Sequence, residues 1–326
     1  MKYLSFISFI LLLAGCSTTR FNTETNNQLS NTTAISNEEL IKHLSSDDLE
    51  GREPGSPGME KATVYVENFL ATMKIKPLFD NSYRDSLKVK GKEAYNVVGV
   101  LPGNKQSNEY VLIGAHLDHL GKINSKTDSV YNGANDNASG VLAVLKIAEE
   151  LKKTNHSRHV IVALFTGEES GLLGSAHLAK RLKKQNIKLK YVINFDMIGS
   201  TLTDKPGKVY ITGYKRTDFA EKSNELLKEE FIVHERADDY YNLFYMSDNY
   251  PFYSEFNIPA HTISTYDFKN FREYHRVGDE YSKLDIENLN SIIGSATTLI
   301  SKLLNTNTDI GFADRNDNNI IVKKNK

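Results

Sequence analysis

The segment VIVALFTGEES, residues 160–170, joins an unbroken apolar run to a pair of adjacent glutamates. Such a run is typical of a strand that is buried on both faces of a parallel sheet. The strand delivers Glu168 and Glu169 to one place, where their mutual repulsion is costly without a cation. One carboxylate can bind a metal ion while the other holds a water molecule as a general base. The alternative is a charged first turn of the following helix.

The pattern of the surrounding chain extends this strand into a sheet. Apolar runs predict further strands over residues 96–101, 110–115, 191–195, 208–212 and 259–264. Helical periodicity predicts helices over residues 60–73, 141–151, 172–183, 219–230 and 286–304, and a capping pattern at 36–39 opens another. Strands that alternate with helices imply a single three-layer α/β domain, whose mixed, mainly parallel central sheet is flanked by helices.

Four more motifs carry histidine or carboxylate side chains. They are AHLDH at 115–119, GANDNASG at 133–140, NFDMIG at 194–199 and YHRVGD at 274–279. Together with the glutamate pair they offer His116, Asp118, Asp136, Glu168, Glu169, Asp196 and His275. Three of the motifs end predicted strands, and ligands of such sheets gather outside the carboxyl ends of the strands. The set is sufficient for two divalent metal ions, with one carboxylate to spare as a base.

Each of these side chains also has a simpler interpretation. A His-x-Asp triplet is commonly incidental, and Asp136 or Asp196 could cap a helix. His275 lies in a loop and is uninformative by itself. Three other histidines near the motifs are interpreted as core or rim residues bonded to the backbone: His119, His177 and His261.

The composition excludes several classes of protein and of site. The formal net charge is −1, so nucleic-acid binding has no electrostatic support. There is one cysteine, Cys16, which excludes an intrachain disulfide and any thiolate-rich metal site. A metal ion must therefore use histidine and carboxylate ligands, which suits zinc, manganese or cobalt.

The N-terminal residues carry an export signal. Lys2 precedes an apolar run over residues 3–14 that is too short to span a bilayer, and Leu13-Ala14-Gly15-Cys16 resembles the lipobox of bacterial lipoproteins. This resemblance implies cleavage before Cys16, lipidation of that residue and attachment to a bacterial membrane, on the periplasmic face or the cell surface. We therefore expect a signal peptide at 1–15, a lipidated flexible tether at 16–35, a domain at 36–304 and a polar tail at 305–326.

The order of the motifs and the residues in them resemble those of the M28 family of zinc metallopeptidases. The resemblance runs from about Asn96 to Asp279, and LEGREPGSPG at 49–58 is similar to the family's N-terminal segment. It implies two zinc ions, which manganese or cobalt could replace. The implied ligands are His116 and Asp196 for one ion, Glu169 and His275 for the other, and Asp136 as the bridge, with a cis bond to Asn137. The resemblance makes Glu168 the general base, and Asp118 the partner of the other ring nitrogen of His116.

Parts of the chain depart from the family pattern. Asn135 and Asn137 stand where some members carry further aspartates, and Asn249 replaces the histidine of a segment that often reads Ser-Asp-His. From the same segment, Asp248 is a candidate substrate contact. Tyr245 is a candidate for stabilising the oxyanion.

The implied activity is that of an aminopeptidase that removes N-terminal residues from peptides. Glutaminyl cyclases share the architecture, but they use one zinc and tend to line the pocket with tryptophan, which this chain lacks. A carboxypeptidase would need a cation for the C-terminal carboxylate, and Arg272 or Arg276 could supply it. A catalytically inactive, lipid-anchored binding protein is the alternative of another class. The sequence implies no particular oligomeric state.

Overall fold

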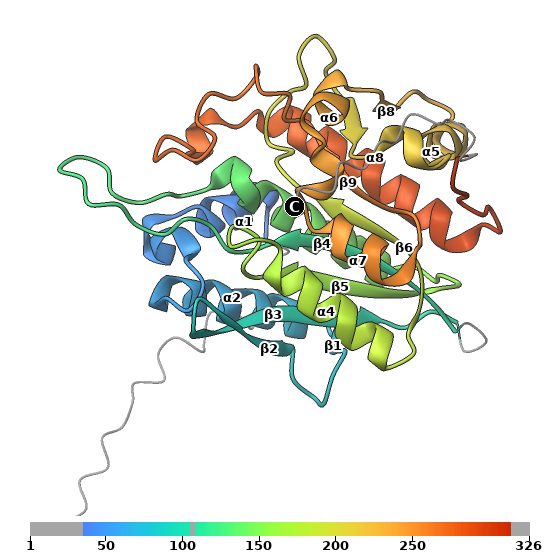
Figure 1. Ribbon diagram of the computed structural model, residues 1–326, viewed down its shortest axis with the longest axis horizontal. Coiled ribbons are helices and arrows are strands. Elements are labelled where there is room, and N and C mark those ends of the chain that lie inside the picture. Colours follow the sequence, from blue (N-terminus) through green and yellow to red (C-terminus); the bar gives the residue numbers. More distant parts are fainter. Residues whose placement is uncertain (1–34, 105–107, 314–326) are drawn as a thin grey trace, which may run out of the picture. The chain divides into compact units, whose positions relative to one another are not determined.

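A computed structural model describes residues 35–104 and 108–313 of the chain. The predicted signal peptide, Cys16 and the tether up to residue 34 lie outside these residues, as does the tail from residue 314. The described part contains one nine-stranded sheet with the order β1-β3-β5-β4-β6-β9-β7-β8, and β2 pairs with β3 (Figure 1). The strands are β1 Lys76–Pro77, β2 Arg84–Val89, β3 Lys92–Leu101, β4 Glu109–His116, β5 His159–Phe165, β6 Lys188–Phe195, β7 Val209–Ile211, β8 Ile232–Val233 and β9 Ala260–Ser264.

The centre of the sheet is parallel and its margins are mixed. Strand β4 pairs in parallel with β5 and β6, and β6 pairs in parallel with β9. Strand β3 runs antiparallel to β5, and β7 runs antiparallel to β9. All residues of β5 after His159 are buried, as expected of a strand covered on both faces. The predicted mixed α/β sheet flanked by helices is confirmed.

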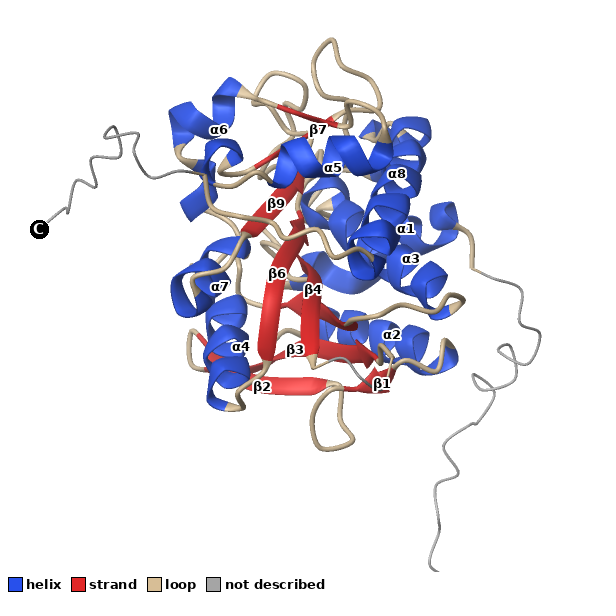
Figure 2. Ribbon diagram, turned by 90° about the vertical axis from the view of Figure 1, so that its right-hand side faces the viewer, coloured by secondary structure: helices blue, strands red, loops and turns tan. Residues whose placement is uncertain are grey.

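Helices cover both faces of this sheet (Figure 2). Helices α4 and α7 pack on each other and on one face, while α3 packs against β4, β6 and α8 on the other. Their bounds are α1 Asn37–Leu44, α2 Pro57–Thr72, α3 Gly140–Lys152, α4 Leu173–Lys184, α5 Phe219–Leu227, α6 Arg236–Tyr241, α7 Asn249–Phe256 and α8 Ile286–Asn305.

Local signals fix most helix ends. Ser36 and Glu39 form the predicted capping box of α1, and the Ser56 hydroxyl caps α2 just before Pro57. Helix α5 ends three residues before the predicted bound because Lys228 adopts a left-handed conformation with φ of 61°. Strand β2 and helices α6 and α7 were not predicted. The aromatic stretch that contains α7 has no clear helical periodicity, and Pro251 lies inside that helix.

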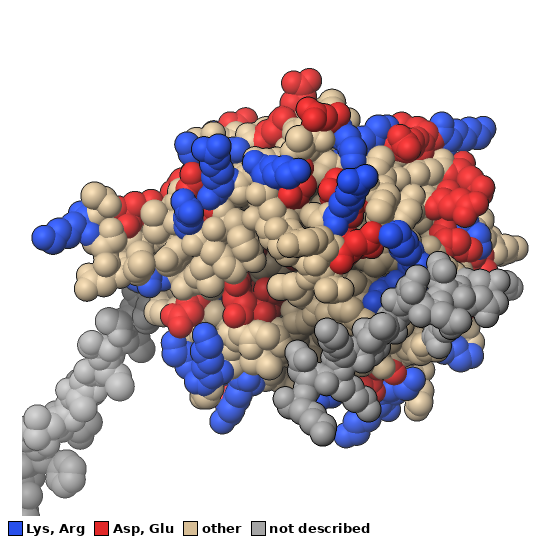
Figure 3. Space-filling view, turned by 45° about the horizontal axis from the view of Figure 1, so that its top comes forward, with Lys and Arg blue, Asp and Glu red and all other residues tan. Residues whose placement is uncertain are grey.

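The surface of the described part mixes both signs of charge. Figure 3 shows lysine and arginine side chains interspersed with aspartate and glutamate side chains over one face. This is consistent with the net charge of −1 and leaves that face without a large single-sign patch. Within residues 35–104 and 108–313, no helix combines the length and apolar character needed to cross a bilayer.

Candidate metal centre

Three of the predicted ligand motifs meet at one edge of the sheet. His116 is the last residue of β4, Glu168 and Glu169 follow β5, and Asp196 directly follows β6. In the parallel register His116 lies opposite Phe165, the last residue of β5, so these strands end at the same level. The carboxyl ends of parallel strands therefore deliver the side chains to one place, as the sequence predicts.

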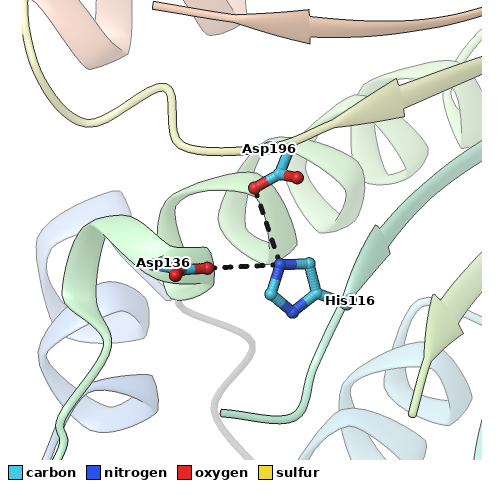
Figure 4. Close-up of side chains that lie close together, drawn as sticks. All are labelled: His116, Asp136 and Asp196. Carbon is cyan, nitrogen blue, oxygen red and sulfur yellow. Dashed lines mark ion pairs between the residues drawn. The ribbon is translucent and has the colours of Figure 1, made fainter. Parts of the chain in front are cut away.

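The first ligand group is His116, Asp136 and Asp196 (Figure 4). The Nε2 atom of His116 lies 3.3 Å from Oδ1 of Asp136 and 3.5 Å from Oδ1 of Asp196. Ligand bonds of about 2.0–2.1 Å at a tetrahedral angle separate neighbouring ligand atoms by about 3.3 Å. The spacing of the donor atoms therefore fits a zinc-sized ion.

The second ligand group uses the other oxygen of Asp136. Both Oδ2 of Asp136 and Oε2 of Glu169 lie 3.2 Å from Nε2 of His275, again at the spacing of neighbouring zinc ligands. Each oxygen of Asp136 thus faces a different group, which is the arrangement that a bridging carboxylate needs. The predicted cis bond between Asp136 and Asn137 is present.

His119 also belongs to this second group and was missed by the sequence analysis. Its Nδ1 atom lies 2.8 Å from Oε1 of Glu169 and 3.9 Å from Oδ2 of Asp136, and the residue is 1% exposed. Glu169 therefore has a buried histidine on one side and the half-exposed His275 on the other. The available signal was its position, three residues after His116 and directly beyond the end of β4.

The buried carboxylates give the centre a strong affinity for cations. Burial opposes protonation of His116, yet Glu168 and hydrogen bonds with Asp136 and Asp196 hold its pKa well above the ordinary value. Burial and Asp136 likewise oppose ionisation of Glu169, but hydrogen bonds from the neighbouring histidines outweigh them and lower its pKa. The donor set thus favours positive charge at both groups, whether proton or metal ion.

Asp118 lies near the Nδ1 atom of His116 with both its main chain and its side chain. Its main-chain carbonyl lies 3.1 Å from Nδ1 of His116, whereas its carboxylate is 3.9 Å from the same atom. The chain turns directly after β4, which brings the carbonyl, rather than the side chain, under the ring. The carboxylate instead accepts a hydrogen bond from the main-chain N–H of Glu168 at 3.2 Å. Asp118 therefore joins the His116 strand end to the Glu168 loop.

Peptidase family M28 provides a sequence profile that matches residues 96–299, the region that holds all of these ligands. The chain belongs to family M28. Among its relatives, an aminopeptidase from Pseudomonas aeruginosa is 41% identical over 115 residues, which are 34% of this chain and 19% of that protein. The chain spans about a third or less of the length of the first curated relatives it matches.

Solved structures share the M28 fold. BSAP, a zinc aminopeptidase from Bacillus subtilis, has a TM-score of 0.65 and 14% identity, covering 84% of this chain and 96% of that one. Glutaminyl cyclase of Porphyromonas gingivalis has a TM-score of 0.63 and 16% identity, covering 82% of this chain and 97% of that one. At these identities the likeness establishes the architecture alone.

The two asparagines that flank the bridging residue of this M28 chain connect it to the neighbouring ligand. The Oδ1 atom of Asn135 accepts from the N–H of Gly199 at 2.8 Å, and Oδ1 of Asn137 accepts from the N–H of Met197 at 3.2 Å. The Asn137 amide also donates to the carbonyl of Phe195 at 2.9 Å, which a carboxylate could not do. These amides fix the Asp136 loop against the segment that holds Asp196.

Asp279 holds the main chain of Asp136 and was not assigned a role from sequence. Its carboxylate accepts the main-chain N–H groups of Asn135 at 2.7 Å and Asp136 at 2.9 Å. Burial raises the pKa of Asp279 to about 6, against the lowering effect of these bonds. The YHRVGD motif thus supplies a ligand, His275, and a support for another ligand.

The Ser-Asp-Asn segment at 247–249 lies near Asp196 and Glu168, and none of its residues is a candidate metal ligand. The Ser247 hydroxyl donates to Oδ2 of Asp196 at 2.9 Å. Asp248 is fully buried and is not among the wall residues of the two cavities described below, and its role as a substrate contact stays a prediction. Burial raises its pKa to about 7. The Asn249 amide donates to the carbonyls of Phe244 and Ala260, and is therefore a structural residue.

A buried arginine ties the loops around the centre together. Arg52, 1% exposed, donates to four main-chain carbonyls: Leu117 at 2.8 Å, Leu44 at 2.5 Å, Asn132 at 2.6 Å and Gly133 at 3.0 Å. The loop that carries Arg52 needs Gly51, because a Cβ atom there would lie 2.1 Å from the carbonyl oxygen of Gly121. The family-like LEGREPGSPG segment is thus attached to both the His116 and Asp136 loops.

Two cavities adjoin the ligands. The first, of about 190 Å³, contains His116, Asp136, Asp196, His275 and Glu168 in its wall, and its apolar side includes Met197, Leu243, Met246, Tyr266, Phe268 and Tyr274. The second, of about 570 Å³, shares only Glu168 and Met246 with the first. Tyr245 lines the second cavity and accepts a hydrogen bond from Arg216 at 2.6 Å. It is absent from the wall of the ligand cavity, whereas Tyr274 is in that wall and stacks on His275.

Proposed function

We propose that this M28 protein is an aminopeptidase that works with two zinc ions. The observation that carries the proposal is the pairing of two ligand groups through Asp136, with Glu168 in the wall of the same small cavity. His116 and Asp196 would hold one ion, Glu169 and His275 the other, and Asp136 both. Two such cations, when bound, lower the pKa of a water molecule and polarise the scissile carbonyl.

Glu168 is suited to be the general base. Burial raises its pKa well above the ordinary value; Asp248, Asp196 and Glu169 add to this, and only His116 opposes it. The positive charge of bound metal ions would favour its carboxylate form, which can take a proton from water and later return it to the leaving amine. The main-chain N–H of Glu168 donates to Asp118, which leaves the Glu168 carboxylate for the role of base. The adjacent Glu169 carboxylate contacts two histidines, His119 and His275, and is instead suited to bind metal.

The ligand cavity favours release of one N-terminal residue. About 190 Å³ holds one side chain, well below the 300–1,000 Å³ typical of pockets for larger ligands. Its charged wall residues are carboxylates and histidines, which suit the free α-ammonium group of a substrate. Lysine and arginine are absent from its described wall, so Arg272 and Arg276 do not offer a carboxylate site there. This argues for an aminopeptidase over a carboxypeptidase.

The hydroxyl of Tyr274 is the better candidate for stabilising the oxyanion. Tyr274 stacks on His275 with ring centroids 3.9 Å apart and lines the ligand cavity. Burial raises its pKa, and so do Asp136 and Asp196, which keeps the hydroxyl protonated and able to donate.

We also propose that the protein is exported and lipid-anchored through Cys16. The support is the Leu13-Ala14-Gly15-Cys16 sequence after a short apolar run. Palmitate labelling and membrane fractionation of the wild type and of Cys16→Ser in a bacterial host test this. Label and membrane association that persist in Cys16→Ser would refute the anchor.

The test of the activity combines metal analysis with a substrate panel. Two zinc ions per chain and hydrolysis of aminoacyl anilides, lost on chelation and restored by zinc, are expected. Acetylated substrates should resist, because they lack the free ammonium group. Cyclisation of N-terminal glutamine without peptide hydrolysis would favour the cyclase alternative. A chain that binds no zinc would refute the proposal.

A further inference from the structure

The larger cavity meets the ligand cavity at Glu168 and Met246. Its wall includes Glu168 and residues of α4 and α7, and none of the proposed metal ligands is among its described wall residues. Helices α4 and α7 lie side by side (Figure 1). A base that returns its proton to the leaving amine must face that amine. The half of the peptide that leaves therefore occupies the cavity that shares Glu168 but not the metal ligands.

One cation lines this cavity along helix α4. The helix carries a cluster of basic residues, and its members have different environments. Arg181 pairs with Asp85 at 2.7 Å and stacks on Phe79, and the Lys183 ammonium lies 5.0 Å from the ring centroid of Phe256. Of the four basic residues of the cluster, of which Lys184 is the last, Lys180 alone lines the cavity, and it forms no ion pair with any described residue. Its ammonium group is therefore available to a ligand in the cavity.

We propose that this cavity is the subsite for the leaving peptide, and that Lys180 binds the free C-terminal carboxylate of short substrates. The inference rests on the proposed aminopeptidase function. A leaving peptide presents an amine at one end and a carboxylate at the other. The cavity presents Glu168 at one end and Lys180 along its wall, so the charges are complementary in that order. Apolar wall residues such as Leu172, Tyr250 and Pro251 contact the side chains between them.

The length of the helix sets the length of the preferred leaving group. The start of α4 lies beside Glu168, because the N–H of Leu172 donates to the Glu168 carbonyl at 3.0 Å. Lys180 lies seven residues beyond Leu173, the first residue of α4, which is roughly 10 Å along the helix axis. An extended peptide advances about 3.3 Å per residue. Leaving groups of two or three residues therefore bring their carboxylate to Lys180, so tripeptides and tetrapeptides are the preferred substrates. A single leaving residue is too short.

Glu255 provides a second test of the proposal, with an expected effect opposite to that of Lys180. It lies on α7, in the other wall of the same cavity, beyond ion-pair distance of Lys180. Its negative charge repels a carboxylate bound at Lys180. Removing the Glu255 charge should therefore strengthen the preference for free acids. Removing the Lys180 charge should abolish that preference.

The experiment compares leucyl peptides with leaving groups of one to five alanines, each as the free acid and as the C-terminal amide. We expect the zinc-loaded wild type to prefer the acid about two- to fivefold in kcat/KM, through KM, for leaving groups of two or three residues. Lys180→Met should equalise acid and amide, and Glu255→Gln should widen the difference. Lys183→Met, in the same basic cluster but outside the cavity wall, is the matched control and should keep the wild-type ratio.

Binding of the leaving group by itself separates this proposal from the activity. Calorimetric titration with Ala-Ala and Ala-Ala-amide is carried out in zinc-loaded Glu168→Gln, which should not hydrolyse these peptides, and tighter binding of the acid that is lost when Lys180→Met is added supports the subsite. Hydrolysis without any acid preference, or with the same preference in Lys180→Met, overturns the subsite and leaves the aminopeptidase assignment in place. Carboxylate-dependent binding without hydrolysis refutes the activity and leaves the subsite.

Discussion

Arg52 provides the sharpest test of how the centre is held, and the perturbation is Arg52→Met. The methionine keeps much of the apolar stem but removes the guanidinium group from four main-chain carbonyls. A buried acceptor left unpaired costs about 1–3 kcal/mol, or roughly 6 kcal/mol for four that relax in part. Burial lowers the pKa of Arg52 to about 10, despite raising effects of Asp279 and Asp136, so relief of the buried charge returns about 3 kcal/mol.

The net loss of stability expected from Arg52→Met is therefore about 3 kcal/mol. For a chain of this size it corresponds to a fall in Tm of about 5 °C. Because two of the released carbonyls, those of Leu117 and Gly133, lie in the ligand loops, zinc affinity should fall as well. Thermal unfolding of chelated protein and competitive zinc titration measure the two effects separately.

The matched control is Arg84→Met. Arg84 pairs with Glu60 and Glu67 at the surface, where its side chain is 26% exposed, so less than about 1 kcal/mol should be lost. Arg52→Lys should fall between the two, since one ammonium group has three donors and cannot bond all four carbonyls. If Arg52→Met unfolds at the temperature of Arg84→Met, the buried guanidinium does not hold these loops.

Three further predictions concern the ligands and the core. Glu168→Gln should bind zinc and fold as the wild type does but lose about 10²–10⁴-fold in kcat, measured with an aminoacyl anilide; near-normal turnover would remove Glu168 from the role of base. His275→Ala should lose one of two zinc ions by mass spectrometry, whereas His119→Ala should keep both with weaker affinity, because we assign the first to the ion and the second to the orientation of Glu169. The reverse pattern would exchange these roles. Burial lowers the pKa of His261 to about 4, so its neutral form contributes stability that is present above about pH 6.5 and is lost as pH falls through 4. Urea unfolding should show that the free energy of unfolding falls between pH 7 and pH 4.5 by up to about 3 kcal/mol less in His261→Asn than in the wild type. Equal decreases in the two proteins would contradict the assignment.

His261 also shows that some simple interpretations from sequence were correct. Its Nδ1 atom lies 2.7 Å from the carbonyl oxygen of Thr212 and its Nε2 atom lies 2.7 Å from the Thr217 hydroxyl, so it is the predicted core histidine. His119 received the same interpretation and contacts Glu169 instead. The two residues look alike in sequence, since only the packing of distant segments decides what faces each ring.

The apolar runs and their terminal carboxylates were sufficient to predict the sheet and the main ligands. Strand character is a local property, and a parallel sheet brings the ends of its strands to one edge, so His116, Glu169 and Asp196 could be placed together without coordinates. The order of the motifs then added Asp136 and His275.

What only the tertiary structure decided is how these candidate ligands are held and which cavities lie beside them. Arg52 and Asp279 act on the Asp136 loop from about 80 and 140 residues away. The carbonyl of Asp118, rather than its carboxylate, supports His116 because of the direction of one turn. Such contacts depend on the relative position of loops that no local pattern encodes. The sequence therefore determined the chemistry available at the sheet edge, while packing between distant segments determined its geometry.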